Sequence, residues 1–198
     1  MTPPPEQLTA LLQLASPSLP IGGYSYSQGL ESAIELGLVH DETTTYQGIA
    51  DQLEHVLGYG EAPLWLSVYN AFQNEDEKTI CRLNDWFMAS RETQEMRQET
   101  QQMGWSLLQL AESLKWCEPH HIDLLKSLDP ASFPCVHAGL VSAKKINSQA
   151  GLTAYLFSWL ENQVMAALKS VPLGQMSGQR VTQQLRETLV DVCEQAHD

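Results

Sequence analysis

The chain has 198 residues, of which 43% are hydrophobic and 18% are charged. This composition is typical of a folded globular protein, and a chain of this length can bury a core without a metal or disulfides. Its 11 basic and 24 acidic residues leave a net charge of −13, which argues against binding to nucleic acid or to an anionic membrane. No apolar run approaches the roughly 20 residues of a membrane span, and the N-terminus does not look like a secretion signal. We therefore expect a cytoplasmic protein.

Apolar residues recur at three- and four-residue intervals along nearly the whole chain, whereas no useful alternating pattern indicates a β-strand. The helices predicted from this spacing, in chain order, cover residues 8–15, 30–34, 49–57, 64–72, 80–87, 90–116, 122–128, 136–146, 152–168 and 181–192. Gly37 is expected to end the second helix and Gly58-Tyr59-Gly60 the third. Pro63 then falls in the first turn of the fourth helix, where proline is tolerated.

These patterns predict an all-α, single-domain helical bundle of about nine to ten helices. The domain is expected to cover residues 1–198. Within it, the helix in residues 1–15 is expected to be loosely attached.

One segment that interrupts the helical pattern is SPSLPIGGYSYSQGLE, residues 16–31, which we call the opening segment. It has neither the GxxxxGK[ST] of a phosphate loop nor the GxGxxG of a dinucleotide site. GYSYS resembles the GxSxG turn that presents a nucleophilic serine, here Ser25. However, Ser27 stands in place of the last glycine, and a helix rather than a strand precedes the turn. A small serine hydrolase therefore stays open only as an alternative function.

The histidines and cysteines show no convincing metal-binding spacing. The six histidines form no HxH, HxxxH or HExxH pattern, and the four cysteines form no CxxC pair. Cys135 and His137 can be read as a soft ligand pair, although a histidine satisfied in the core or in an interface is the more common arrangement. We therefore predict no catalytic residues, no metal site and no enzyme activity.

A second unusual segment is VPLGQMSGQR, residues 171–180, which we call the C-terminal segment. Gly174 and Gly178 are four residues apart, so on a helix they share a face that another backbone can approach closely. Gln175 and Gln179 offer amide groups beside that face. Arg180 can make a forked contact with a carboxylate.

In the opening segment, Ser25 and Gln28 are spaced as a capping box for the following helix. Tyr24 and Tyr26 are then expected to project from the loop. Because tyrosine and arginine are enriched at protein interfaces, we predict that both segments are surfaces for contact with other proteins.

The two segments also carry a resemblance to a known family. The opening segment resembles the N-terminal signature of the urease accessory protein F (UreF) family, and the C-terminal segment resembles its C-terminal signature. Between them, RETQEMRQETQQMGWSLLQL (91–110) and FPCVHAG (133–139) resemble the family's long-helix segment and its short P-V-x-x-G element. The four matches follow the order of the family and span residues 16–180.

The resemblance implies an all-α fold, a homodimer, and a non-catalytic role in assembling the nickel centre of urease. It implies a scaffold that acts with urease accessory proteins D/H and the GTPase accessory protein G on apo-urease, and that modulates the GTPase. Nickel would be handled by the complex and GTP bound by the partner, so no cofactor is expected to stay bound to this chain. Residues 172–198 would contact D/H, and the dimer face would contact the GTPase.

Carried onto this sequence, the resemblance and the two segments give nine candidate partner-binding residues: Tyr24, Tyr26, Gln28, Glu31, Lys169, Gly174, Gln175, Gln179 and Arg180. A generic helical adaptor unrelated to nickel remains a further alternative.

Overall fold

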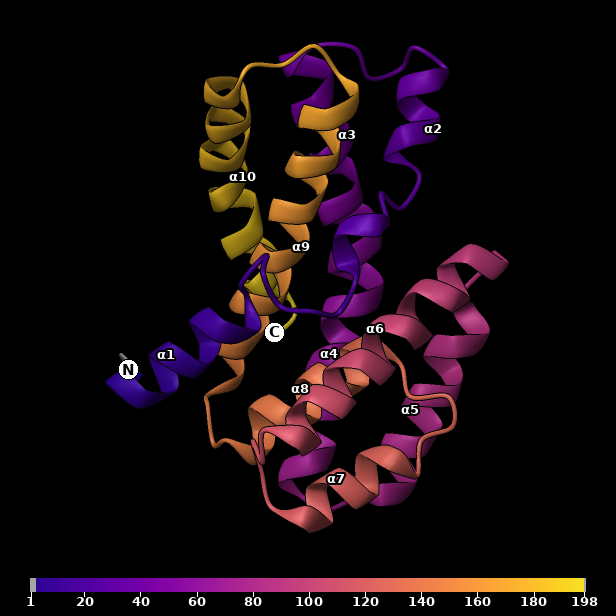
Figure 1. The fold of residues 1–198 in the computed structure, drawn as a ribbon, viewed down its shortest axis with the longest axis vertical. Helices are drawn as coiled ribbons and strands as arrows, with labels where there is room; N and C mark the ends of the chain where they lie inside the picture. Colours follow the sequence, from indigo (N-terminus) through magenta and orange to yellow (C-terminus); the bar gives the residue numbers. More distant parts are fainter. Residues whose placement is uncertain (1–2, 198) are drawn as a thin grey trace.

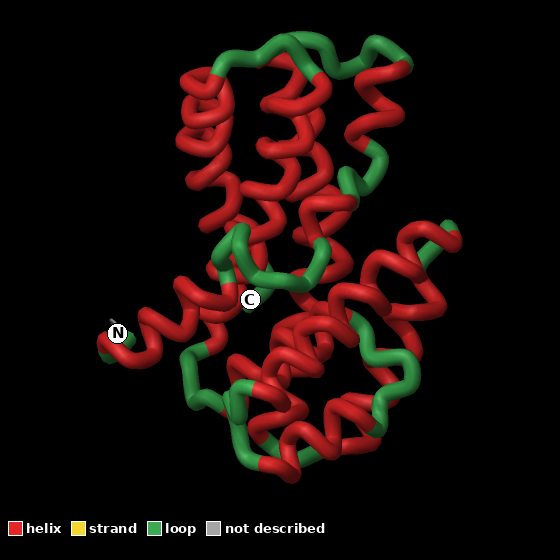
Figure 2. Tube along the Cα trace, in the orientation of Figure 1, coloured by secondary structure: helices red, strands yellow, loops and turns green. Residues whose placement is uncertain are grey.

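The computed structural model describes residues 3–197, although for Tyr24 it describes the backbone and not the side chain. The described residues are mostly helical and contain no β-strand, which confirms the all-α prediction (Figure 2). The α-helices are α1 (Pro5–Leu14), α2 (Leu30–Glu35), α3 (Glu42–Gln52), α4 (Ala62–Gln73), α5 (Glu77–Ser90), α6 (Gln94–Ser113), α7 (Pro119–Lys126), α8 (Phe133–Ala143), α9 (Ser148–Ser170) and α10 (Gln175–Gln195). A 3-10 helix, η1 (Gly23–Ser25), and a π-helix, η2 (Leu53–Glu61), complete the set.

The helices form two groups that share α9 (Figure 1). In the upper group α3, α9 and α10 run alongside one another, with α2 next to them. In the lower group α8 packs against α4 and α6, and α5 and α7 lie at its edges. The long helix α9 contacts both groups, because its first half packs against α4 and α8 and its second half against α2. No helix in the described part of the chain is both long enough and apolar enough to cross a bilayer.

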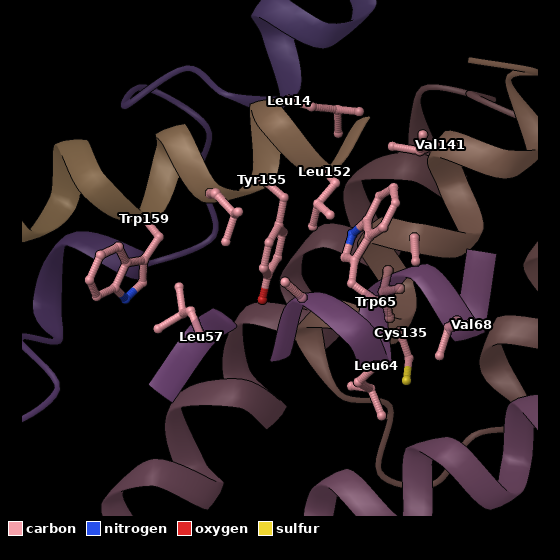
Figure 3. Packing of buried hydrophobic residues seen from close by; sticks show 14 of the residues in the cluster. Leu14, Leu57, Leu64, Trp65, Val68, Cys135, Val141, Leu152, Tyr155 and Trp159 are labelled. Carbon is pink, nitrogen blue, oxygen red and sulfur yellow. The ribbon is translucent and has the colours of Figure 1, made fainter. Parts of the chain in front are cut away.

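The buried apolar side chains form a core that continues from one group to the other. Trp65 of α4, Val141 of α8 and Leu152 of α9 pack together at its centre (Figure 3). On α1, Leu11 and Leu14 are buried in the same core, whereas Leu12 is 63% exposed. The loose attachment of α1 stays a prediction.

The predicted helix end at Gly58-Tyr59-Gly60 is wrong, because the chain stays helical from α3 through η2 into α4. Leu53 and Leu57 of η2 are fully buried, and burial of each leucine contributes about 1.5–3 kcal/mol. That gain exceeds the cost of about 1 kcal/mol for each glycine in a helix. Proline conflicts with the carbonyl four residues before it in an α-helix, and the wider i→i+5 turns of η2 avoid this conflict ahead of Pro63.

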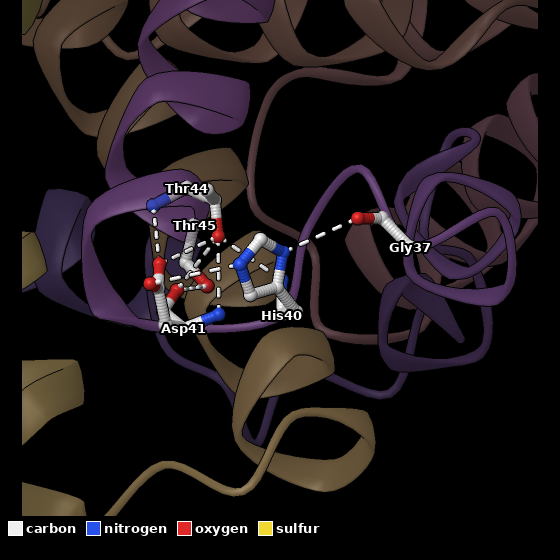
Figure 4. A network of polar contacts seen from close by, with 5 residues as sticks. All are labelled: Gly37, His40, Asp41, Thr44 and Thr45. Atoms are coloured by element: carbon white, nitrogen blue, oxygen red, sulfur yellow. Dashed lines mark hydrogen bonds and ion pairs between the residues drawn. The ribbon is translucent and has the colours of Figure 1, made fainter.

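The two ends of the connection between α2 and α3 follow local rules. Gly37 has a φ of 74°, as predicted for a residue that ends a helix. Asp41 begins α3: its Oδ1 accepts the Thr44 backbone N–H at 2.8 Å, and the Thr44 hydroxyl accepts the Asp41 N–H in return (Figure 4). This capping box stabilises the first turn of α3.

The capping box predicted for Ser25 and Gln28 is wrong. The residue before α2 is Gly29, with a φ of 91°, and the backbone N–H of Glu31 in the first turn donates to Oγ of Ser27 at 3.4 Å. Ser25 instead lies exposed at the end of η1.

Helix α6 passes directly beneath the loop that leads into α8. A Cβ added at Gly104 would lie 2.3 Å from the carbonyl oxygen of Ala131. The Thr100 hydroxyl, one turn earlier, accepts the backbone N–H of Phe133 at 3.0 Å. Only glycine at position 104 allows this close approach of the two backbones.

Candidate functional site

Within the opening segment, Gln28 makes hydrogen bonds to three helices. Its Nε2 donates to Oε1 of Glu99 on α6 at 2.8 Å, and its Oε1 accepts from Nε1 of Trp159 on α9 at 2.6 Å. Its backbone carbonyl accepts from Nε2 of Gln52 on α3 at 3.0 Å. Its amide group is thus held between two helices of the same chain. The prediction that Gln28 contacts a partner is not tested by these contacts.

A buried ionic network lies beneath Gln28. Glu61, the last residue of η2, accepts a hydrogen bond from the hydroxyl of Tyr155 on α9. Nη1 of Arg91, just after α5, lies 3.6 Å from Oε2 of Glu61. With Glu99, the network contains two carboxyl groups and one guanidinium, and both carboxyl residues are only 9% exposed.

The two carboxyl groups hold their protons more tightly than exposed glutamates do. Burial raises the pKa of Glu61, although Tyr155 and Arg91 oppose the shift. Burial also raises the pKa of Glu99 to about 7, opposed by the hydrogen bond from Gln28 and assisted by the charge of Glu61. The residue that anchors the opening segment through Gln28 therefore titrates near neutral pH.

A small cavity of about 50 Å³ lies within this network. It is bordered by Tyr26, Gln28 and Gln163 together with the ionic residues. Ligand pockets usually have several hundred Å³, whereas this cavity has room for very few water molecules. Two buried polar atoms near it, Oε1 of Gln163 and Nε of Arg91, have no hydrogen-bond partner in the described part of the chain. The cavity therefore fits ordered water better than a substrate.

Cys135 and His137 are both buried in α8. Nδ1 of His137 accepts a hydrogen bond from Nε1 of Trp65 at 3.2 Å, and burial lowers the pKa of His137 to about 3. Burial raises the pKa of the Cys135 thiol to about 12. His137 is thus a neutral core histidine, the more common of the two arrangements considered from the sequence. Among residues 3–197, no three His, Cys, Asp or Glu side chains cluster in a way that could hold a metal ion.

The C-terminal segment leads from α9 into α10, which begins directly after Gly174. At Gly178, an added Cβ would lie 2.8 Å from Cδ1 of Leu168, so this glycine makes room for α9 of the same chain. The expectation that both glycines open a face to a partner is therefore wrong for Gly178. Of the two glycines in this segment, only Gly174 has no atom within 4 Å of an added Cβ. Gln175 and Gln179 are exposed, as is Met176 between them.

Arg180 makes the predicted forked contact, but with a carboxylate of its own chain. Its Nε and Nη2 donate to the two carboxyl oxygens of Glu42, in the first turn of α3, at 2.8 and 2.6 Å. Nη2 also donates to Oγ of Ser177 at 2.9 Å. The hydrogen bonds from Arg180 lower the pKa of Glu42 to about 2.

The fold brings the ends of the two segments together. Leu30, near the end of the opening segment, and Val171, which begins the C-terminal one, are buried in one small apolar cluster with Val39 and Ala167. The remaining candidates lie around these segments. Tyr26 is half-buried, Glu31 on α2 and Lys169 at the end of α9 are exposed, and the side chain of Tyr24 lies outside the described part of the structure.

The sequence analysis missed the residues of the buried network and the partner of Arg180. Glu99 had a usable signal, because it follows Met96 by three residues and precedes Met103 by four, on the side of the helix that was predicted to be buried. Glu42, Glu61 and Tyr155 had none. The hydrogen bond between Tyr155 and Glu61 joins positions 94 residues apart, and the one between Arg180 and Glu42 joins positions 138 residues apart.

Comparison with known proteins finds relatives that all carry the name of one family. The model of the UreF family matches residues 39–186. A urease accessory protein UreF of Bordetella parapertussis is 53% identical over 178 residues, which are 90% of this chain and 81% of that protein. The UreF of Cupriavidus taiwanensis is 48% identical over 190 residues, 96% of this chain and 83% of that protein.

A bifunctional urease accessory protein UreEF of Bordetella bronchiseptica is 54% identical over 183 residues, which are 92% of this chain but only 42% of that longer protein. The family match covers most of the helical core, and the relatives align over nearly all of the chain. This chain therefore belongs to the UreF family.

Proposed function

We propose that this chain is a non-catalytic accessory protein of urease maturation. In this proposal it acts in the cytoplasm as a homodimeric scaffold, together with urease accessory proteins D/H and the GTPase accessory protein G. The complex acts on apo-urease, handles the nickel and modulates the GTPase, while GTP is bound by the partner. Membership of the UreF family supports the maturation role.

The observation that carries the proposal is the exposed start of α10. Gln175, Gln179 and Arg180 are exposed on the first turns of that helix. Their backbone is fixed from two sides, because Gly178 packs on Leu168 of α9 and Arg180 is paired with Glu42 of α3. A rigid surface with exposed amide and guanidinium groups loses little conformational freedom when a partner binds. This favours the start of α10 as the docking surface for the D/H protein.

The pair formed by Arg180 and Glu42 permits a sharp test. If Arg180 is an anchor for the partner, Arg180→Ala should weaken D/H binding about tenfold or more, as for other arginine hot spots. Glu42→Gln is the matched control, because it weakens the internal pair while leaving the guanidinium in place. Binding by Glu42→Gln should then be equal to or tighter than that of the unmodified chain.

Both variants are measured by titrating labelled D/H protein at two salt concentrations, with folding checked by circular dichroism. Equal losses in the two variants would show that Arg180 only shapes its own chain. The maturation role itself is tested by the nickel content of urease produced with and without this chain. Urease that acquires its full nickel content without the chain would overturn the proposed function.

A further inference from the structure

Residues 23–28 of the opening segment, which we call the lid, lie between two glycines that permit a hinge. Gly22 has a φ of 81° and Gly29 a φ of 91°, and at each of them an added Cβ would meet no atom within 4 Å. Glycine moves through this left-handed region at little cost, whereas other residues are strained there. The backbone–backbone hydrogen bonds of the lid are local, since they join positions three residues apart. The lid can therefore rotate about its two ends without breaking an α-helix.

Polar contacts of Gln28 attach the lid to the body of the protein. Its side chain bonds to Glu99 of α6 at 2.8 Å and to Trp159 of α9 at 2.6 Å. Gly23 is buried but has no side chain, and Tyr26 is only half-buried. Segments that bury few apolar side chains open at a lower free energy than the fold as a whole. We therefore expect the lid to open more readily than the helices unfold.

The lid separates the buried ionic network from solvent. Tyr26 borders the cavity of about 50 Å³ in the network and also borders a depression on the outer surface, beside Trp105 of α6. Movement of the lid would admit water to Oε1 of Gln163 and Nε of Arg91, the two atoms near the cavity that have no hydrogen-bond partner in the described part of the chain. Hydration of these atoms offsets part of the loss of the Gln28 contacts.

Titratable and charged groups face Glu99 from four elements. They are Glu61 of η2, Arg91 just after α5, Tyr155 of α9 and Tyr26 of the lid. The neighbours on α6 and α8 that border the same cavity carry no ionisable group; they are Met96, Thr100, Met103, Phe133 and Pro134. Glu61 disfavours a second negative charge at Glu99 and Arg91 favours it, but burial has the larger effect. Tyr155 stays neutral, because burial raises its pKa.

We propose that residues 23–28 act as a hinged lid over the ionic network, and that ionisation of Glu99 favours opening of this lid. In the closed state Glu99 is only 9% exposed, so its negative charge is kept from water. The hydrogen bond from Gln28 favours the charged form and opposes opening. Burial outweighs this bond, since the pKa of Glu99 remains raised to about 7. A rise in pH therefore favours the state in which water reaches Glu99.

The two pKa values of Glu99 set the size of the effect. With a pKa of about 7 under the closed lid and the ordinary value of 4.5 in the open state, the opening equilibrium constant should rise about 25-fold between about pH 5.5 and pH 8. Opening breaks the bond between Gln28 and the indole N–H of Trp159, which then exchanges with solvent. The indole N–H of Trp65 is an internal reference for global unfolding, because this residue is fully buried and donates to His137 in the core.

The test measures solvent exchange of the indole N–H groups of the full-length chain by NMR over this pH range. The two resonances are assigned by Trp159→Phe and Trp65→Phe, and N-acetyltryptophanamide supplies the unprotected exchange rate at each pH. Trp159 should exchange at least about tenfold faster than Trp65 at every pH, as expected for local opening. In Glu99→Gln most of the rise with pH should be lost, because the amide carries no charge and still accepts from Gln28. Glu95→Gln, at an exposed position of the same helix, should keep the full rise.

Gly22→Ala tests the hinge without altering any charge. An alanine at a φ of 81° strains the closed lid, so the opening constant should increase about fivefold or more at every pH. Gly37→Ala is the matched control, because Gly37 also has a positive φ of 74° and open space but lies between α2 and α3. It should leave the exchange of Trp159 unchanged. Together with the pH series of the unmodified chain, this pair keeps the test decisive if Glu99→Gln does not fold.

Three results would overturn the proposal. Equal exchange rates for Trp159 and Trp65 would show that Gln28 is released only by global unfolding. Exchange of Trp159 that does not depend on pH after correction, or that rises equally in Glu99→Gln, would exclude Glu99 as the trigger. Equal effects of Gly22→Ala and Gly37→Ala would exclude the hinge. None of these results touches the maturation role, which the nickel content of urease tests separately.

Discussion

Replacing Glu99 by glutamine should remove much of the pH dependence of folding near neutral pH. The pKa of Glu99 is about 7 in the folded chain, above its ordinary value of 4.5, so the folded state holds this proton more tightly than the unfolded state. Stability from this group is complete below about pH 4.5 and is lost as the pH rises through about 7. Between about pH 5.5 and pH 8 these two pKa values give a loss of about 2 kcal/mol in the free energy of unfolding.

Urea unfolding at several pH values measures the effect. The difference in unfolding free energy between the unmodified chain and Glu99→Gln should change by about 2 kcal/mol across this range, or about 1 M in the urea midpoint for a chain of this size. The glutamine can still accept the hydrogen bond from Gln28, so the opening segment stays anchored. Taking the difference removes the part of the Glu61 contribution that does not depend on the charge of Glu99; the raised pKa of Glu61 acts in the same direction.

Glu95→Gln is the matched control on the same helix. Glu95 is exposed, and hydrogen bonds at the start of α6 lower its pKa, so it stays ionised throughout the range. Its replacement should leave the shape of the pH profile unchanged. A difference between the unmodified chain and Glu99→Gln that stays constant with pH would refute the argument that burial holds a proton on Glu99.

Two further predictions concern packing and chemical reactivity. Gly104→Ala should destabilise the fold near or above the upper end of the range of about 1–3 kcal/mol for overpacked sites, because the added Cβ meets the carbonyl oxygen of Ala131. Thermal unfolding measures this, and Gly60→Ala, with open space at its Cα, should cause no loss of stability; equal melting temperatures for the two variants would contradict the prediction. A thiol reagent should label the half-buried Cys81 and Cys117 well before the buried Cys135, whose pKa is about 12. Early labelling of Cys135 in the native chain, followed by mass spectrometry, would show that α8 opens locally.

The helix positions could be read from the sequence because each helix buries one face, and this leaves a periodic trace of apolar residues. Helix ends were predictable where a local conformation requires a particular residue, as at Gly37. The prediction was wrong at Gly58-Tyr59-Gly60 because glycine is only a weak helix breaker there. Leu53 and Leu57 gain more by packing against the rest of the molecule than the glycines cost.

For the candidate residues, too, the sequence indicated what a side chain can do but not which distant residue it contacts. The sequence indicated that Arg180 suits a forked contact, since that depends on the shape of its own side chain. It did not indicate Glu42, 138 positions away, as the partner. From the sequence, Gln28 was predicted to form a capping box with Ser25 and to be a candidate partner-binding residue. The sequence did not indicate that its amide bonds to Glu99 and Trp159, which come from different helices.

The amino-acid sequence by itself determined the all-α class, most helix positions and the two unusual segments, because these depend on interactions within about one helical turn or on the residue types themselves. The tertiary structure alone decided which polar groups are buried together and which glycine serves internal packing. The physical reason is that burial and pairing depend on segments that are distant in the chain and become neighbours only after folding.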